Sequence, residues 1–168
     1  DGSYAITWQS PGVLVYQEYL AVYQFADSQN VDAVSVVSTP DINLDLSAVI
    51  TVGGDVTISD NDNLVTLDLH NLTSIGGNFV LSNNGALLTI TLPVLSSVGG
   101  SIDISSNTGA TTIDVGSLTT VGGSIDINND TGATTIDLSS LTTVGGSIDI
   151  SNNDSAGVID VGATAVGG

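Results

Sequence analysis

Pairs of adjacent glycines recur at a fixed spacing, and this period limits what the chain can fold into. Five of the pairs are 23 residues apart and follow Val52, Ile75, Val98, Val121 and Val144. The eleven letters SLTTVGGSIDI occur twice, at 117–127 and at 140–150. A fixed period of this length is typical of repeat proteins in which one structural unit stacks on the next.

Each repeat contains two apolar-x-apolar triplets, the alternation expected of a strand with one buried face. In the first set the apolar residues are Val56/Ile58, Phe79/Leu81, Ile102/Ile104, Ile125/Ile127 and Ile148/Ile150. In the second set they are Leu44/Leu46, Leu67/Leu69, Ile90/Leu92, Ile113/Val115, Ile136/Leu138 and Ile159/Val161. Many of these residues are β-branched, as pleated and half-buried positions favour. The pattern predicts two short strands in each coil, paired with the same strands of the coils on either side.

The predicted fold is an all-β repeat solenoid of about six coils, formed by residues 34–168. One coil cannot bury its own apolar face, whereas stacked coils can. We expect the Gly-Gly pair to form a tight bend, where positive φ or close backbone approach requires glycine. We expect a third apolar column to fill a corner of the coil, formed by Val49, Leu72, Leu95, Leu118 and Leu141.

The N-terminal segment departs from the repeat, and residues 1–33 are interpreted as a cap. Ser10 and Pro11 suit an N-cap and a first helical position, and apolar and aromatic residues follow at near-helical spacing. The segment therefore predicts a helix over about 11–27 that covers the first coil. In the alternative interpretation, the letters SYAITW add a strand to a neighbouring subunit. Residues 31–41 are expected to form a degenerate first coil, shifted by one residue.

A column of amides follows the first predicted strand of each coil by three residues. Inward-facing side chains there are expected to satisfy buried loop backbone groups from coil to coil, a structural ladder. Its members are Asn61, Asn84, Asn107, Asp130 and Asn153, with one carboxylate among the amides.

The spacing Ile125-x-Ile127-x-x-Asp130, with Asn in the neighbouring coils, resembles the L-x-L-x-x-N core of leucine-rich repeats. The fuller unit SLTTVGGSIDISNN is most similar to the receptor L-domain-like repeats of secreted and cell-surface microbial proteins. The resemblance covers roughly residues 42–166. It implies a solenoid architecture and an extracellular or cell-surface location. Such repeats serve adhesion, ligand binding and wall structure alike, so the resemblance selects no single activity.

The charge balance excludes several classes of partner. The chain has 17 Asp and one Glu but no Lys or Arg, a formal net charge of −18. Binding to nucleic acid or to anionic lipid by charge needs cations, so neither is expected. Metal ions and basic proteins or surfaces are the natural charge partners. The longest charge-free run, 69–102, is interrupted by polar residues and Pro93, so no membrane insertion is expected.

The outward positions of both strands are predicted to form acidic columns. Carboxylates about 4.8 Å apart repel by about 0.9 kcal/mol in bulk water, so the columns favour cations, protonation or a partner. Calcium bridging is one hypothesis, because this ion prefers oxygen ligands, and calcium is the only cofactor the sequence indicates. The candidate ligands are Asp103, Asp126 and Asp149 on the first strand and Asp114, Asp137 and Asp160 on the second.

A threonine column is the basis of a second hypothesis, ice binding. On a flat β-face a regular Thr column resembles the ice-binding face of some solenoid antifreeze proteins. The intervening outward residue is usually Asp, and Thr89-x-Thr91 is the one Thr-x-Thr pair. The column consists of Thr66, Thr89, Thr112 and Thr135. A plain soluble surface, copied by duplication, explains both sets of columns equally well.

Other chemical signals are few. His70 stands at a turn position, and we expect it to be an exposed turn residue. No Ser/His/Asp arrangement repeats, and no acid pair marks a cleft, so an enzyme is not expected. Asn71 and Asn129 are possible N-glycosylation sites, whereas Asn153 matches the sequon but belongs to the inward ladder.

The C-terminal end of the repeat is expected to be bare. The pattern continues to Ala165–Gly168 with one residue deleted and stops at the bend. Either the chain is a fragment of a longer protein, or another subunit covers its end in a polymer. We expect an extracellular, non-enzymatic structural or adhesive protein that assembles with itself end to end. The alternative is a module that binds ice, calcium or glycan through a repetitive face.

Overall fold

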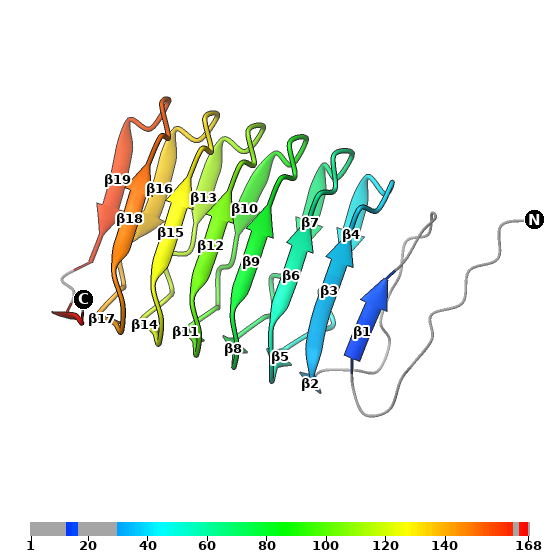
Figure 1. Cartoon of the computed structure of the whole chain (residues 1–168), viewed down its shortest axis with the longest axis horizontal. Coiled ribbons are helices and arrows are strands. Elements are labelled where there is room, and N and C mark those ends of the chain that lie inside the picture. The colour runs from blue at the N-terminus through cyan, green and yellow to red at the C-terminus, as the bar shows by residue number, and fades with distance from the viewer. Residues whose placement is uncertain (1–12, 17–29, 163–164, 168) are drawn as a thin grey trace, which may run out of the picture.

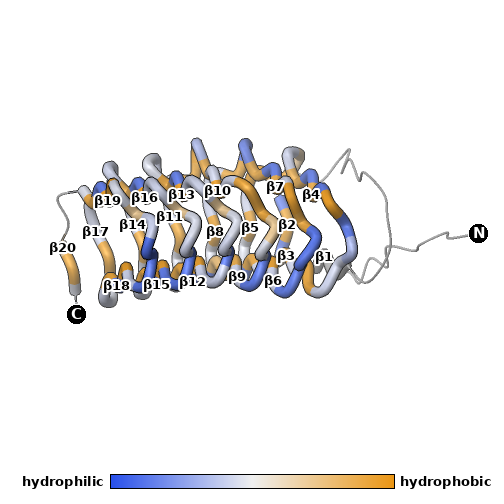
Figure 2. Tube along the Cα trace, turned by 90° about the horizontal axis from the view of Figure 1, so that it is seen from above, coloured by the Kyte–Doolittle hydropathy of each residue, from blue (hydrophilic) through white to orange (hydrophobic). Residues whose placement is uncertain are grey.

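The computed structural model describes residues 13–16, 30–162 and 165–167, and all regular structure within them is β-strand. The strands form parallel sheets in which each strand pairs with its counterpart one coil away, so the chain is an all-β parallel solenoid. Figure 1 shows the coils in chain order along one axis, and Figure 2 shows the same stack from above. The all-β solenoid predicted from the repeat is confirmed. Among the described residues there is no apolar helix of membrane-spanning length.

The first face of the solenoid is a seven-stranded sheet. Inward residues of its strands are buried and the residues between them are half-buried, as in Ile102–Ser105. The strands are β1 (Val13–Tyr16), β3 (Ala33–Val37), β6 (Val56–Ser59), β9 (Phe79–Ser82), β12 (Ile102–Ser105), β15 (Ile125–Asn128) and β18 (Ile148–Ser151).

The second face consists of a two-stranded and a four-stranded sheet. It contains the second predicted set of apolar triplets. The two-stranded sheet pairs β4 (Asn43–Asp45) with β7 (Thr66–Asp68). The four-stranded sheet contains β10 (Thr89–Thr91), β13 (Thr112–Asp114), β16 (Thr135–Leu138) and β19 (Val158–Val161).

A third face corrects the prediction of two strands per coil. Strands of two residues lie directly before the Gly-Gly pairs and form a second seven-stranded sheet. Two residues are too few to show an alternation, which is why the triplet pattern missed them. The strands are β2 (Asn30–Val31), β5 (Thr51–Val52), β8 (Ser74–Ile75), β11 (Ser97–Val98), β14 (Thr120–Val121), β17 (Thr143–Val144) and β20 (Ala165–Val166).

The ends of the repeat show the expected shifts in register. Val34 lies opposite Val56, 22 residues away, so residues 31–41 do contribute a shifted first coil. Ala165 lies opposite Thr143, also 22 residues away, as the one-residue deletion indicated.

The predicted helix over 11–27 is wrong at Val13–Tyr16, which form strand β1. β1 pairs in parallel with β3 and places Leu14 opposite Val34. Short apolar runs fit a helix or a strand equally well, and here the open edge of β3 offers a partner that favours a strand. The remainder of the predicted helix, and the SYAITW segment, lie outside the described residues.

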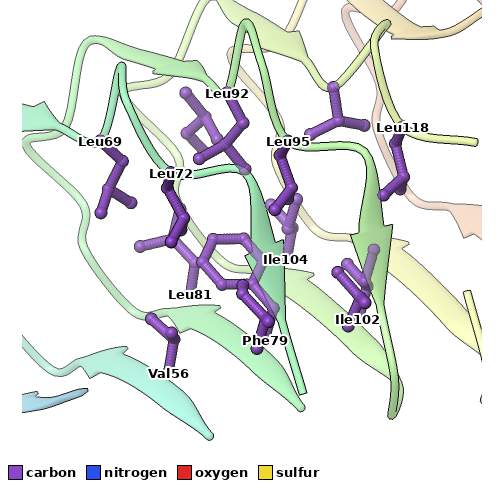
Figure 3. Close-up of a cluster of buried hydrophobic side chains, with 14 of the residues drawn as sticks. Val56, Leu69, Leu72, Phe79, Leu81, Leu92, Leu95, Ile102, Ile104 and Leu118 are labelled. Carbon is purple, nitrogen blue, oxygen red and sulfur yellow. The ribbon is translucent and has the colours of Figure 1, made fainter. Parts of the chain in front are cut away.

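Apolar columns along the solenoid axis form the core. Figure 3 shows part of it, with Leu72, Phe79 and Leu81 packed between the faces. Each of these three side chains is fully buried. The predicted corner column is buried throughout, at Val49, Leu72, Leu95, Leu118 and Leu141.

The Gly-Gly bend requires glycine because successive coils approach closely there. A Cβ on Gly99 would lie 2.2 Å from the carbonyl oxygen of Gly76, and one on Gly122 would lie 2.0 Å from that of Gly99. Positive φ occurs elsewhere, at non-glycine residues just after the first-face strands, among them Asp60, Asn83 and Asn129. Close approach is therefore the requirement at the Gly-Gly bend.

Candidate functional site

The amide column lies inside the coils and forms a continuous ladder. Asn84 Nδ2 donates to the carbonyl of Ile58 at 3.0 Å and to Asn107 Oδ1 at 3.1 Å. Asn61, Asn84 and Asn107 are fully buried. Equivalent Nδ2 bonds to main-chain carbonyls link Asn61 to Val36, Asn107 to Leu81 and Asn153 to Ile127. These side chains replace the water that the loop carbonyls would otherwise bind.

Asp130 occupies one position of this ladder and is also fully buried. Its Oδ1 accepts bonds from Asn107, from the main-chain N at 2.7 Å and from Nδ2 at 3.2 Å. Its Oδ2 is buried and has no hydrogen-bond partner among the described residues. Desolvation raises the pKa of the carboxyl to about 6, against the lowering effect of the Asn107 bonds.

The structure brings the predicted acidic residues into register. On the first face Asp103 lies opposite Asp126, and Asp126 lies opposite Asp149. Asp103 and Asp126 are half-buried, and Asp149 is exposed. Oδ1 of Asp103 is buried and lacks a hydrogen-bond partner among the described residues. Like charges are therefore stacked without an opposite charge from Lys or Arg, which the sequence lacks.

The second-face acidic column caps the turn that follows each strand, a role that the sequence pattern did not reveal. Asp114 Oδ1 accepts the main-chain N–H of Gly116 at 3.0 Å, and Asp137 Oδ1 accepts that of Ser139 at 2.8 Å. Asp45 and Asp68 make the same bond to the residue two positions later. The bonds from Ser47 hold the pKa of Asp45 below its usual value.

The one replacement in the described turns fits this role. Where the other strands have Asp, β10 has Thr91, and the residue two positions later is Pro93. Proline has no N–H to donate, so a carboxylate there would cap nothing. Asp160, at the end of the column, is exposed.

The described residues contain no group of three or more His, Cys, Asp or Glu side chains placed to hold a metal ion. The six candidate calcium ligands lie as two columns on different faces, β12–β15–β18 and β13–β16–β19. Each column supplies one carboxylate per coil, whereas calcium takes six to eight oxygen ligands.

The threonine column lies in register on the second face. Thr89 pairs with Thr112, and Thr112 pairs with Thr135. Thr66 and Thr89 are exposed, and the other two are half-buried. Thr91 on β10 is exposed too, so one Thr-x-Thr pair faces solvent. The acidic column runs beside the threonines over the other coils.

A further polar column, also unpredicted, follows the Gly-Gly bend. Asp55 Oδ1 accepts the main-chain N–H of Asn78 at 2.7 Å, and Asn78 Oδ1 accepts that of Ser101 at 2.8 Å. Ser101 and Ser124 continue the pattern with their hydroxyl oxygens. Most of the column is Ser, Asn or Asp, and this shared ability to accept a bond was the signal available in the sequence.

A groove of about 540 Å³ runs along the third face over four coils. Its lining consists of Thr, Ser, Val, Ile and Gly, with hydroxyl groups at Thr51, Ser74, Ser97 and Thr120. None of its lining residues carries a titratable side chain. The groove therefore offers no general acid, base or charged ligand.

The coil of β18, β19 and β20 leaves its apolar residues uncovered. Ile159 is 49% exposed and Val166 is 50% exposed, although the same columns are buried one coil earlier at Ile136 and Val144. Each of the three strands is the last in its sheet and presents a strand edge.

The remaining candidates are on the surface. His70 is exposed, and its Nδ1 lies 2.6 Å from Asp68 Oδ1. Asn71 is exposed, with Nδ2 donating to the carbonyl of Ser47 at 2.8 Å. Asn129 is exposed and has a φ of 57°. Asn71 and Asn129 remain possible glycosylation sites, while Asn153 is engaged in the ladder.

Comparison with protein-family models, curated proteins and solved structures finds no match to this chain.

Proposed function

We propose that this chain is a non-enzymatic structural or adhesive protein of the cell exterior that assembles end to end through its last coil. The observation that carries the proposal is the uncovered end of the core. Buried columns that run through the stack end there in half-buried or exposed residues: Ile148, Ile150, Ala156, Ile159, Val161 and Val166.

A second copy of the chain is the partner that this end fits best. Each coil presents strand edges on three faces and apolar columns between them, in nearly the same register throughout. Another solenoid end supplies unpaired main-chain groups and apolar side chains at that spacing. If the last coil of one copy meets the first coil of the next, the contact does not close on itself and generates a filament.

Charge sets the conditions under which assembly is expected. Each copy has a formal net charge of −18, so two copies repel over long distances. Physiological salt screens charges beyond about 8 Å, which leaves the apolar contact at the end to act. Assembly should therefore strengthen as salt concentration rises.

The test is a charged substitution on the end coil. Ile159→Asp places a carboxylate in the uncovered column and is expected to abolish association in sedimentation velocity at physiological salt. Leu88→Asp is the matched control, because Leu88 is 53% exposed but lies in the middle of the stack. It should associate like the native chain. Circular dichroism confirms that both variants fold.

Two outcomes contradict the proposal. One is a native chain that sediments as the 16.8 kDa monomer at every protein and salt concentration tested. The other is a loss of association that is equal in the two folded variants, because the end coil would then have no special role.

The extracellular and adhesive parts of the proposal rest on the resemblance to L-domain-like leucine-rich repeats. The structure supports it through the buried amide ladder, which has the position that the L-x-L-x-x-N pattern assigns to Asn. The non-enzymatic part rests on the regularity of the faces, since the described polar side chains serve turns and ladders. Glycan and basic surfaces are further partners consistent with an acidic, hydroxyl-rich exterior.

Ice binding is the second candidate, favoured by the exposed Thr89 and Thr91 and the in-register column from Thr89 to Thr135. A thermal hysteresis assay tests it directly. Hysteresis lost in Thr112→Tyr would support this candidate, and its absence in the native chain would contradict it.

A further inference from the structure

The amide ladder contains one position at which the hydrogen-bond pattern cannot continue with an ionised side chain. In the coils on either side, Nδ2 of Asn107 donates to the carbonyl of Leu81, and Nδ2 of Asn153 donates to that of Ile127. Both acceptors lie 26 residues before the donor. The equivalent acceptor for residue 130 is the carbonyl of Ile104.

Asp130 follows the pattern with one oxygen and breaks it with the other. Its Oδ1 accepts from Asn107, as each ladder Oδ1 accepts from the preceding coil. The repeat then places Oδ2 where its neighbours have Nδ2. Oδ2 is buried without a hydrogen-bond partner among the described residues. An ionised carboxylate there would bring two acceptor oxygens together with no hydrogen between them.

We propose that Asp130 is folded into the ladder as the neutral acid, with its Oδ2–H donating to the carbonyl of Ile104, so that the solenoid binds a proton on folding. A protonated carboxyl has the same donor and acceptor pair as the amide it replaces. The ladder is then complete in every described coil. Loss of the proton leaves a buried charge and an unpaired carbonyl in the middle of the stack.

The surrounding charges favour the neutral form. Burial raises the pKa of Asp130 to about 6, and the negative charge of Asp103 on β12 raises it further. Asp126 on β15 and Asp149 on β18 belong to the outward column of the same sheet, and Asp154 in the next loop is exposed. These groups are also acidic. The elements packed against Asp130 contribute no cation, because the chain has no Lys or Arg and its one His is distant in the repeat, at position 70.

The sign of the pH effect follows from the raised pKa. The unfolded carboxyl titrates near 3.8 and the folded one near 6, so the folded chain holds the proton between these values. Stability is therefore greatest below about pH 4 with respect to this group and falls as pH rises through 6. Above that pH the folding equilibrium constant is lowered by about 100-fold relative to a chain with an amide at this position.

Asp130→Asn is the test, and it should fold because the neighbouring coils have Asn at this position. The variant is expected to be more stable than the native chain at pH 7.5, by up to about 100-fold in the folding constant from urea unfolding. The difference should vanish near pH 4. Asp149→Asn is the matched control, because it removes the same charge from an exposed position of the outward column.

The protonation state is measured independently. The carboxyl ¹³C resonance of Asp130 should titrate near pH 6 in the folded native chain. The inference is overturned if that resonance titrates near pH 4. It is also overturned if Asp130→Asn and Asp149→Asn have the same pH profile of stability. Neither result depends on association of the chain, so failure of end-to-end assembly would leave this inference intact.

Discussion

At the scale of single residues, the repeated aspartate of the second face is explained by the turn after it. Asp114 and Asp137 each accept a main-chain N–H two positions later. Such side-chain bonds to the local backbone favour Asp and Asn at turns. The column lacks Asp where Pro93 removes the donor. The acidic surface is thus in part a by-product of turn formation, repeated with the coil.

This role predicts a difference between two neutral substitutions. Asp137→Ala should lower the free energy of unfolding by about 1 kcal/mol relative to Asp137→Asn, because only Asn keeps an acceptor for the Ser139 N–H. Both variants remove the same charge, so relief of repulsion cancels in the comparison. Urea unfolding at pH 7 measures the difference. Equal stabilities would show that Asp137 does not stabilise the turn.

At the scale of the element, the position of each coil is set by the close approach at the glycine bend. The first glycine of each pair lies against the carbonyl of the glycine one coil earlier, as Gly99 does against Gly76. The short third-face strands lead into this bend and pair through only two residues each. Backbone contact between coils therefore takes the place of side-chain packing at this corner.

A methyl group at the bend is expected to force the coils apart. Gly99→Ala places Cβ within 2.2 Å of a backbone oxygen, which cannot move without shifting the coil. We expect a loss of about 1–3 kcal/mol in the free energy of unfolding, the range for overpacked sites. Gly85→Ala is the control, since its Cβ would meet only the Thr108 hydroxyl at 3.6 Å. Thermal unfolding should leave the control near the native value, and an unchanged Gly99→Ala would contradict the close approach.

The sequence predicted those elements that repeat with a clear alternation. The 23-residue period and the two triplets located the first-face and second-face strands, the core columns and the amide ladder. The third-face strands were missed because two residues carry no period. Val13–Tyr16 were assigned to a helix because a short apolar run after Ser-Pro suits a helix start. Their pairing with β3 depends on a contact distant in sequence, which the local pattern does not contain.

The candidate sites divide in the same way. The ladder position of Asp130 could be predicted from spacing, but its missing donor became visible only with the geometry of Oδ2. The calcium hypothesis followed from the acidic columns alone. It did not anticipate that the second-face carboxylates are already hydrogen-bonded to turns. A column in a sequence specifies neighbours along the stack, whereas a site needs groups that converge from several directions.

At the scale of the whole molecule, the solenoid is a stack whose coils depend on their neighbours. Ile127 is fully buried because coils lie on both sides of it, and Ile150 in the same column is only partly buried. The last coil therefore has the least packing and the most to gain from a partner. Its strand edges and apolar columns are the features that make self-association the central claim of this account.

Electron microscopy of the chain at physiological salt tests that claim most directly. The account predicts unbranched filaments one molecule wide, with the solenoid axis along the filament. Fibre diffraction of aligned filaments should then show a spacing of about 4.8 Å along the axis, from coils stacked across the contact. Dispersed single particles at every protein and salt concentration would contradict end-to-end assembly of this chain.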